Sequence, residues 1–428
     1  MSRRVFVTGV SAICSSGRSP EEIWLAVSGG RSAIGPIRGW DAAGWPARLA
    51  GEVRDFNPRA LVEDRKLHKL LGRGDFLGLH AGARALEGSG ILQHREKLDP
   101  EAAEAFNDRS AVFVGSGAAS YQSQYDFLPL LARAAGDLQA FGAELESIVS
   151  PMWLLRTLPN NVLCHLGIRS SFKGTNACIT SHGVSGALAL AEAAAALRSG
   201  EADRALAVAH CAPVEPQNIM YYHSLGLLDP EGLRPFDGGR QGTILGEGAA
   251  ALLLETELSA RSRGAEVFGE LLGSGCAAEG EGLLSVREDG DGVSRAVTQA
   301  LAGAGLEPKD VGFIVAHGSG TGRSDASEAR AIIRTFGARP PPVTSFKWAF
   351  GNCIDAAGLL DSLLALRCLA GGRVPAIPTF REPEPECEGL HFSRECRAPR
   401  AATALVLSRG LGGVSAALLL RYAGGRDS

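Results

Sequence analysis

Cys178 has the side chain and the sequence context of a nucleophile. It lies in the segment Gly174–Gly183, directly before an alanine-rich stretch, Gly186–Leu197, that predicts a helix closed by Gly200. A cysteine at a helix start meets backbone N–H groups and the positive end of the helix dipole, and both favour the thiolate. The alternative is a buried structural thiol. His182, four residues later, could face the same pocket.

Two polar residues in the second half of the chain are candidates for acid–base or oxyanion chemistry. His317 follows the apolar run Val311–Val315, so we expect it at the carboxyl end of a buried strand, where α/β sites lie. Asn352 follows Gly351 in a loop. The alternatives are a capping or packing role for the histidine and ordinary turn formation for the asparagine.

Two glycine-rich segments could position a site. Arg234–Gly248 mixes glycines with Asp237 and Glu247, which we expect to pair with nearby arginines in a tied loop. Ser408–Ser415 predicts a tight turn between two apolar strands, where a backbone can approach a ligand closely. The sequence has no phosphate-binding loop and no His-Glu-x-x-His motif.

In their order along the chain, these five segments resemble the beta-ketoacyl-[acyl-carrier-protein] synthase family, especially its elongating members. The resemblance runs from Val7-Thr8-Gly9 to the last apolar strand. It implies a catalytic set of Cys178, His317 and Asn352. It further implies support from Asp325, Glu328 and Lys347, a backbone oxyanion hole at Cys178 and Leu411, an acyl pocket and gate at Ala118 and Leu411, and pantetheine binding at Ser319 and Thr321.

The resemblance also implies a reaction in fatty acid or polyketide biosynthesis. An acyl group would pass from a carrier thioester to Cys178 and then undergo decarboxylative Claisen condensation with a malonyl thioester. The substrates would be held on the phosphopantetheine of an acyl carrier protein or on CoA, and no other cofactor and no metal are expected. The family is dimeric as a rule, so a homodimer, or a heterodimer with a related ketosynthase, is expected. Tyr121–Trp153 is the candidate interface or cap.

The sequence departs from the elongating pattern at Asn352, Leu411 and Ser415, and also at Ala118, where a larger side chain often divides the acyl tunnel. Asn352 replaces the second catalytic histidine, and Leu411 replaces a gating phenylalanine. An asparagine amide can donate a hydrogen bond, but it cannot act as acid or base near neutral pH. Three hypotheses therefore stay open: a condensing enzyme, an acyltransferase that uses Cys178 without decarboxylation, and a non-catalytic partner like the chain-length factors. The cysteine speaks against the third, because such partners usually lack it.

Short, continuously apolar runs alternate with helical stretches in two rounds, which predicts an α/β protein. The resemblance implies a thiolase-like fold of two pseudo-symmetric halves, residues 1–262 and 263–428, in α-β-α-β-α layers. The N-terminal half would carry the cysteine, and the C-terminal half the histidine and asparagine.

The composition narrows the partners and the location. The formal net charge is −4, which gives no basic surplus for nucleic acid. No unbroken apolar stretch is long enough to predict a membrane span. The nine cysteines are scattered and form no Cys-x-x-Cys pair. A reducing cytoplasm is therefore the expected location.

Overall fold

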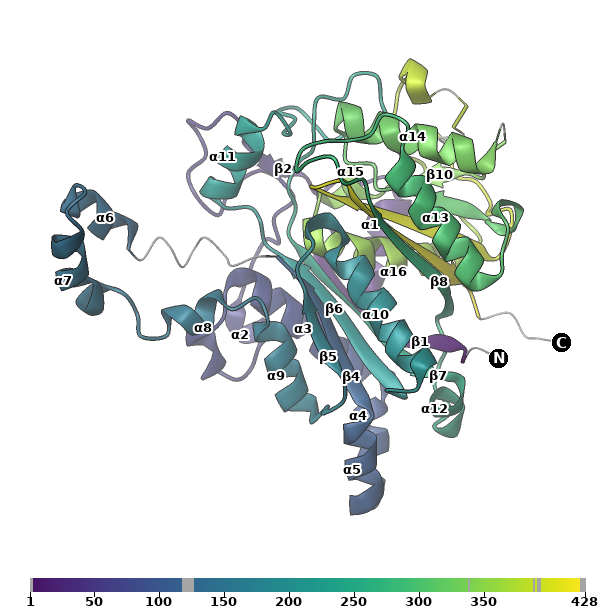
Figure 1. The fold of residues 1–428 in the computed structure, drawn as a ribbon, viewed down its shortest axis with the longest axis horizontal. Coiled ribbons are helices and arrows are strands. Elements are labelled where there is room, and N and C mark those ends of the chain that lie inside the picture. The colour runs from purple at the N-terminus through teal and green to yellow at the C-terminus, as the bar shows by residue number, and fades with distance from the viewer. Residues whose placement is uncertain (1–2, 118–126, 338, 388, 391–393, 424–428) are drawn as a thin grey trace.

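The computed structural model describes residues 3–117, 127–337, 339–387, 389–390 and 394–423. One ten-stranded sheet runs through the molecule (Figure 1). Its strands in chain order are β1 (Val5–Cys14), β4 (Ser110–Ser116), β5 (Asn176–Ile179), β6 (Arg204–Cys211), β7 (Gly248–Thr256), β8 (Gly269–Ala278), β9 (Phe313–Val315), β10 (Val343–Thr344), β11 (Thr403–Gly410) and β12 (Val414–Arg421). The short strands β2 (Gly35–Pro36) and β3 (Leu49–Ala50) form a separate pair.

The sheet consists of two halves with the same internal order. The first half runs β1-β7-β6-β4-β5 and the second runs β8-β12-β11-β9-β10, joined where β1 pairs with β8. When the strands of each half are numbered along the chain, both orders read 1-5-4-2-3. In both halves the last three strands of this order are parallel to one another. The expected α/β architecture of two similar halves is therefore observed.

Helices cover and separate the two half-sheets. In chain order, the α-helices of the described residues are α1 (Pro20–Ser28), α2 (Pro58–Leu61), α3 (Arg73–Ser89), α4 (Ile91–Arg95), α5 (Pro100–Asp108), α6 (Leu128–Ala134), α7 (Leu138–Ile148), α8 (Trp153–Thr157), α9 (Asn161–Ser170), α10 (Ser185–Ser199), α11 (Pro216–Ser224), α12 (Glu257–Ser262), α13 (Asp291–Ala304), α14 (Gly322–Phe336), α15 (Lys347–Phe350) and α16 (Ala357–Ala370). Helices α3 and α9 cover one half-sheet and α13 covers the other, while α10 and α16 pack between them.

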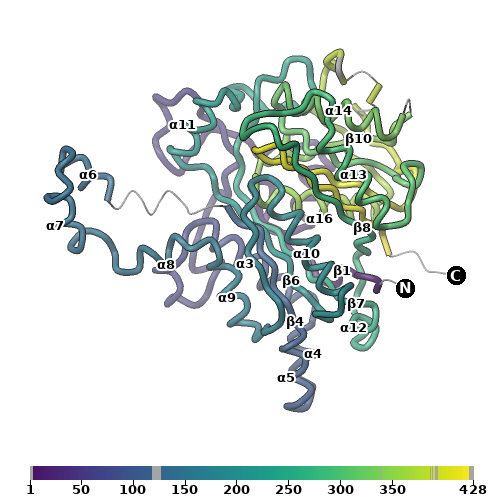
Figure 2. The backbone as a smooth tube through the Cα atoms, viewed as in Figure 1, coloured from purple at the N-terminus to yellow at the C-terminus, as the bar shows by residue number. Residues whose placement is uncertain are grey.

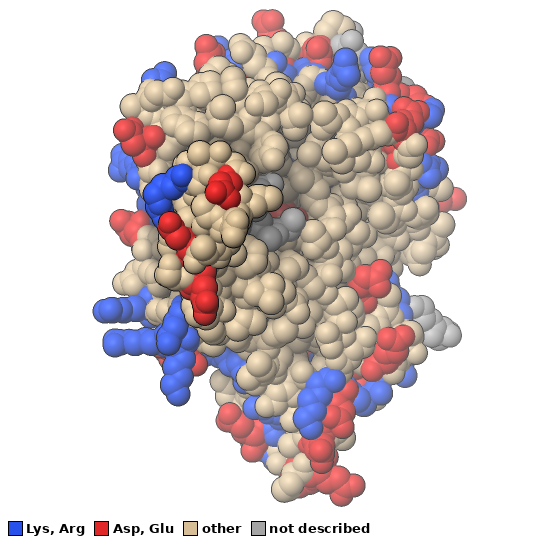
Figure 3. All heavy atoms as spheres, turned by 60° about the vertical axis from the view of Figure 1, so that its left-hand side comes forward, with Lys and Arg blue, Asp and Glu red and all other residues tan. Residues whose placement is uncertain are grey.

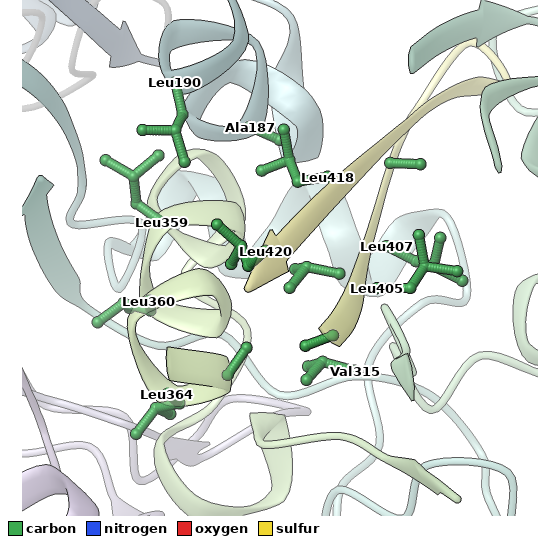
Figure 4. Close-up of a cluster of buried hydrophobic side chains, with 14 of the residues drawn as sticks. Ala187, Leu190, Val315, Leu359, Leu360, Leu364, Leu405, Leu407, Leu418 and Leu420 are labelled. Atoms are coloured by element: carbon green, nitrogen blue, oxygen red, sulfur yellow. The ribbon is translucent and has the colours of Figure 1, made fainter. Parts of the chain in front are cut away.

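The central layer is held by apolar packing. Leu190 of α10 and Leu359 of α16 lie in one buried cluster with Leu405 and Leu418 of the second half-sheet (Figure 4). Helix α10 ends as predicted, since Gly200 has the left-handed backbone (φ 84°) of a C-cap. The core therefore fixes the starts of α10 and α16 relative to each other.

Helices α6 and α7 project from the body of the molecule (Figures 1 and 2). They belong to the predicted interface segment Tyr121–Trp153, of which the structure describes residues 127 to 153. Large apolar side chains are exposed on and near these helices, with Leu138 at 78% and Leu154 at 61%. Among the described residues, no helix is long and apolar enough to cross a membrane.

Candidate active site

Two corners, each leading into one of the central helices α10 and α16, meet at the centre of the molecule. Strand β5 leads through a 3-10 turn, His182–Val184, into α10; in the other half, a 3-10 turn, Ile354–Ala356, leads into α16. The first residue of each turn has a left-handed backbone that non-glycine residues seldom adopt, with φ 52° at His182 and 38° at Ile354. Ser185 Oγ donates a hydrogen bond of 2.8 Å to Asp355 Oδ1, which ties the two corners together.

Cys178 does not lie at the helix start. It lies on β5 opposite Val114 of β4, and parallel partners in register point to the same face of a sheet. Val114 belongs to the core cluster that contains Val162 of α9, and Cys178 Sγ lies 3.3 Å from the carbonyl oxygen of Pro159, just before α9. The expectation of a helix-start thiol is therefore wrong, because the strand extends through Cys178 and turns its side chain toward α9.

The environment of Cys178 also disfavours the thiolate. Partial burial raises the pKa of the thiol to about 11, and the neighbouring Cys164 and the carboxylate of Asp355 add to this shift. The thiol is therefore protonated at neutral pH, contrary to the lowered pKa that a helix start would give.

His182 and Gly183 occupy the corner itself. A Cβ atom at Gly183 would lie 2.1 Å from the carbonyl oxygen of Arg409, so a side chain does not fit there without a backbone shift. The segment from Thr180 to Ser185 contains no cysteine. The corner at the start of α10 therefore presents an imidazole in place of a thiol.

His182 is held by two hydrogen bonds. Its Nδ1 accepts the backbone N–H of Leu411 at 3.2 Å, and its Nε2 lies 2.7 Å from the hydroxyl of Tyr222. Burial lowers the pKa of His182 to about 4, so the ring is neutral at pH 7. Because Nδ1 is an acceptor, Nε2 carries the ring hydrogen and donates a hydrogen bond to the Tyr222 hydroxyl. The Leu411 amide, one of the two predicted oxyanion-hole donors, is thereby engaged by His182.

His317 lies buried after β9, as predicted. Glu328 accepts the backbone N–H groups of His317 and Gly318 at 2.7 and 3.0 Å, and burial raises the pKa of this carboxyl to about 7. Burial, with the positive charges of Lys347 and Arg409 nearby, lowers the pKa of His317 well below its usual value. The imidazole is therefore neutral and can offer one N–H donor and one acceptor.

The surrounding polar groups form a buried framework. Lys347 Nζ pairs with Asp361 Oδ2 at 3.1 Å, and both side chains are almost fully buried. Asp325 accepts backbone N–H groups from Phe236 and Gly320. The hydroxyls of Ser319 and Thr321 lie 2.8 Å apart.

Asn352 combines a turn role with a free donor group. Its Oδ1 accepts the backbone N–H of Ile354 at 3.1 Å, which is the turn geometry that its sequence context allows. The bond fixes the orientation of the amide and leaves the Nδ2 hydrogens as donors for a ligand.

Two cavities meet at the first corner. The first, of about 500 Å³, is lined by His317, Asn352, Ser319 and Thr321. The second, of about 450 Å³, is lined by residues that include Gly117 and Asp355. Four residues line both cavities: His182, Tyr222, Leu225 and Leu411.

Several predicted site residues thus come together around the first cavity, while Cys178 lines neither cavity. Ala118, the other predicted gate residue, lies outside the described residues. The sequence interpretation named His182 only as a possible neighbour and missed Tyr222. In the described part of the chain, no group of three or more His, Cys, Asp or Glu side chains is placed to hold a metal ion.

Comparison with known proteins identifies the fold and the family. The ishigamide ketosynthase/chain length factor structure superposes with a TM-score of 0.87 at 28% identity, covering 99% of this chain and 100% of that one. A beta-ketoacyl synthase from Burkholderia phymatum superposes with a TM-score of 0.85 at 26% identity, covering 98% and 100%. The fold is thus the thiolase-like fold of the ketosynthases.

Proteins that are similar in sequence indicate the same family as the similar structures. Nodulation protein E of Rhizobium sp. is 30% identical over 98% of this chain and 100% of its own length. The 3-oxoacyl-[acyl-carrier-protein] synthase 2 of Synechocystis sp. is 28% identical over 98% of each chain. The beta-ketoacyl synthase N-terminal domain matches residues 2–260 and the C-terminal domain matches residues 268–381. The chain belongs to the beta-ketoacyl synthase family.

Proposed function

We propose that this chain works in fatty acid or polyketide biosynthesis as the non-acylated partner of a second ketosynthase-family chain that carries the nucleophilic thiol. The corner before α10 carries this proposal, because it presents His182 and Gly183 while Cys178 faces α9. A similar structure is described as a ketosynthase/chain length factor, which supports a paired arrangement.

The first cavity is the proposed site for a carrier-held thioester, on the phosphopantetheine of an acyl carrier protein or on CoA. The neutral His317 ring and the Asn352 amide can donate hydrogen bonds to a carbonyl oxygen. The hydroxyls of Ser319 and Thr321 can bind the amides of the pantetheine arm. Lys347, Asp325 and Glu328 would act by holding this framework in place.

The proposed partner would cover the face that carries α6 to α8. Leu138, Leu154 and Leu155 are exposed there, and Met220 and Leu225 of the neighbouring region are at least 40% exposed. Figure 3 shows that the surface around the hollow on this face is mostly uncharged. Apolar surface of this kind is typical of an interface. The cytoplasm remains the proposed location, supported by nine cysteines that all lie within the described residues and form no disulfide.

The second candidate function is acyl transfer to Cys178 by this chain itself, followed by condensation or by transfer to another acceptor. Two observations favour it: the thiol is only partly buried, and related proteins are beta-ketoacyl synthases.

Mass spectrometry of the intact protein separates the two candidates. The chain would be incubated with acetyl-, octanoyl- and palmitoyl-carrier proteins, alone and after co-expression with an active ketosynthase. The partner proposal expects no acyl adduct on Cys178, and it expects Cys178→Ser to leave the product of the pair unchanged. Cys164→Ser, at an exposed cysteine, is the matched control. An adduct on Cys178 that passes to a beta-keto product when malonyl carrier is added would overturn the proposal.

A further inference from the structure

We propose that His182 and Tyr222 form a hydrogen-bonded partition between the two cavities, and that this partition restricts the first cavity to thioesters of short acyl groups. The inference rests on the proposed binding of carrier thioesters beside His317 and Asn352. It adds a selectivity device that acts whether or not this chain is acylated.

The position of the two rings carries the inference. His182 and Tyr222 each line both cavities, so their rings stand where the two spaces adjoin. The rings are stacked, with an interplanar angle of 19° and centroids 6.3 Å apart, and a hydrogen bond of 2.7 Å between Nε2 and the hydroxyl joins them. Because His182 comes from the corner and Tyr222 from α11, the partition joins two separate elements.

The partition is fixed in place from one side. The Leu411 N–H donates to Nδ1 of His182, which sets the tautomer that donates to Tyr222. The left-handed backbone of His182 further limits how its side chain can be placed. A ring held by its backbone and by both nitrogens does not rotate aside without breaking hydrogen bonds in a largely buried place.

The space beyond the partition could accept an alkyl chain if the rings were absent. Leu158, Pro159 and Leu225 give the second cavity apolar walls. Each methylene that leaves water for such a wall strengthens binding several-fold. Removal of the partition should therefore change the affinity for long acyl groups much more than the affinity for short ones.

Isothermal titration with acetyl-pantetheine and dodecanoyl-pantetheine tests the inference on the full chain, purified with its partner if one accompanies it. The wild type should bind acetyl-pantetheine and should bind dodecanoyl-pantetheine no more tightly. His182→Ala should bind dodecanoyl-pantetheine about tenfold or more tighter than the wild type does, with the acetyl affinity within about twofold. Tyr222→Phe should shift the same ratio in the same direction by less, because its ring remains.

His223→Ala is the matched control, since His223 is the exposed neighbour of Tyr222 and lines neither cavity. It should keep the wild-type ratio. Unchanged acetyl affinity in His182→Ala shows that the fold and the first cavity are intact, so a general structural role would not produce the expected pattern. If the wild type gains affinity with chain length, or if His182→Ala leaves the ratio unchanged, the partition is refuted. If no variant binds acetyl-pantetheine, the proposed thioester site is refuted together with the partition.

Discussion

The two corners at the centre of the molecule share a backbone design and differ in chemistry. The first follows β5 directly, and the second follows β10 through the short helix α15. Each then passes through a 3-10 turn whose first residue has a positive φ, and enters a central helix. The second half surrounds its corner with polar groups, among them Asn352 and the buried pair of Lys347 and Asp361. At the fifth residue of its central helix, where α16 has Asp361, α10 has Ala189.

Backbone contacts explain why the first corner keeps the backbone shape of the second although it lacks the same polar groups. The second residue of each central helix is a glycine that approaches the opposite corner. A Cβ at Gly186 would lie 2.6 Å from the carbonyl oxygen of Asp355, and a Cβ at Gly358 would lie 2.9 Å from the backbone nitrogen of Ala187. The corners are thus held by main-chain packing, which leaves the reactive side chains free to differ.

The largest expected effect lies in the second half, at the buried ion pair. Asp361→Ala would leave Lys347 charged and unpaired in the core, and we expect the free energy of unfolding to fall by about 3–5 kcal/mol. Urea denaturation measures this change. Glu144→Ala, which breaks an exposed pair with Arg133, should change it by less than about 1 kcal/mol. Equal losses in the two variants would mean that the second half does not depend on its charged framework.

The first half should respond to pH through His182. Its pKa is about 4 in the fold and about 6.5 when unfolded, so between these values the unfolded chain binds more protons and stability falls as pH drops. His182→Gln should remove about 2–3 kcal/mol of the fall between pH 7 and pH 4.5, measured by urea denaturation at both pH values. His223→Gln should keep the wild-type dependence. Parallel curves for His182→Gln and wild type would contradict the neutral, buried ring.

Alkylation should distinguish Cys178 from a corner nucleophile. The rise in the pKa of its thiol from 9.0 to about 11 lowers the thiolate fraction at pH 7.5 about 100-fold, so iodoacetamide should modify it about 100-fold more slowly than an unperturbed thiol. Peptide mapping over time gives the rate, with the exposed Cys164 as internal reference. A rate at Cys178 equal to that at Cys164 would favour the second candidate function, acyl transfer to Cys178.

The smallest expected effect is steric. Gly183→Ala would place its Cβ 2.1 Å from Arg409 O, and the backbone shift that this requires should cost about 1–3 kcal/mol of unfolding free energy. Gly303→Ala in α13, where a Cβ meets open space, should instead stabilise slightly. A fully stable Gly183→Ala protein would show that the corner has room for a side chain.

The sequence predicted the elements whose signals are local. The alanine-rich run and its glycine cap gave α10, and the apolar runs around Ser408–Ser415 gave the β11–β12 hairpin. The burial of His317 followed from its place after an apolar strand. These inferences need only neighbouring residues, so they survive without knowledge of the tertiary contacts.

The position of Cys178 in the fold could not be predicted from neighbouring residues. Strand β5 is only four residues long, and no periodic pattern marks where it turns into the corner. The match of Ala177-Cys178 to a family motif placed the predicted nucleophile at Cys178, whereas the residues that directly precede α10 in the structure are His182–Val184. Contacts such as that of Ser185 with Asp355 join residues 170 positions apart and leave no local trace.

The left-handed backbone of His182 also makes that residue the natural place to engineer a new nucleophile. Gly183 has no room for a side chain, whereas the side chain at position 182 already reaches both cavities. His182→Cys would place sulfur there, release the Leu411 amide as a free donor, and add only the modest strain of a non-glycine residue at positive φ, which the scaffold already bears. The corner before α10 lacks a thiol, but its backbone can already accept a cysteine at position 182.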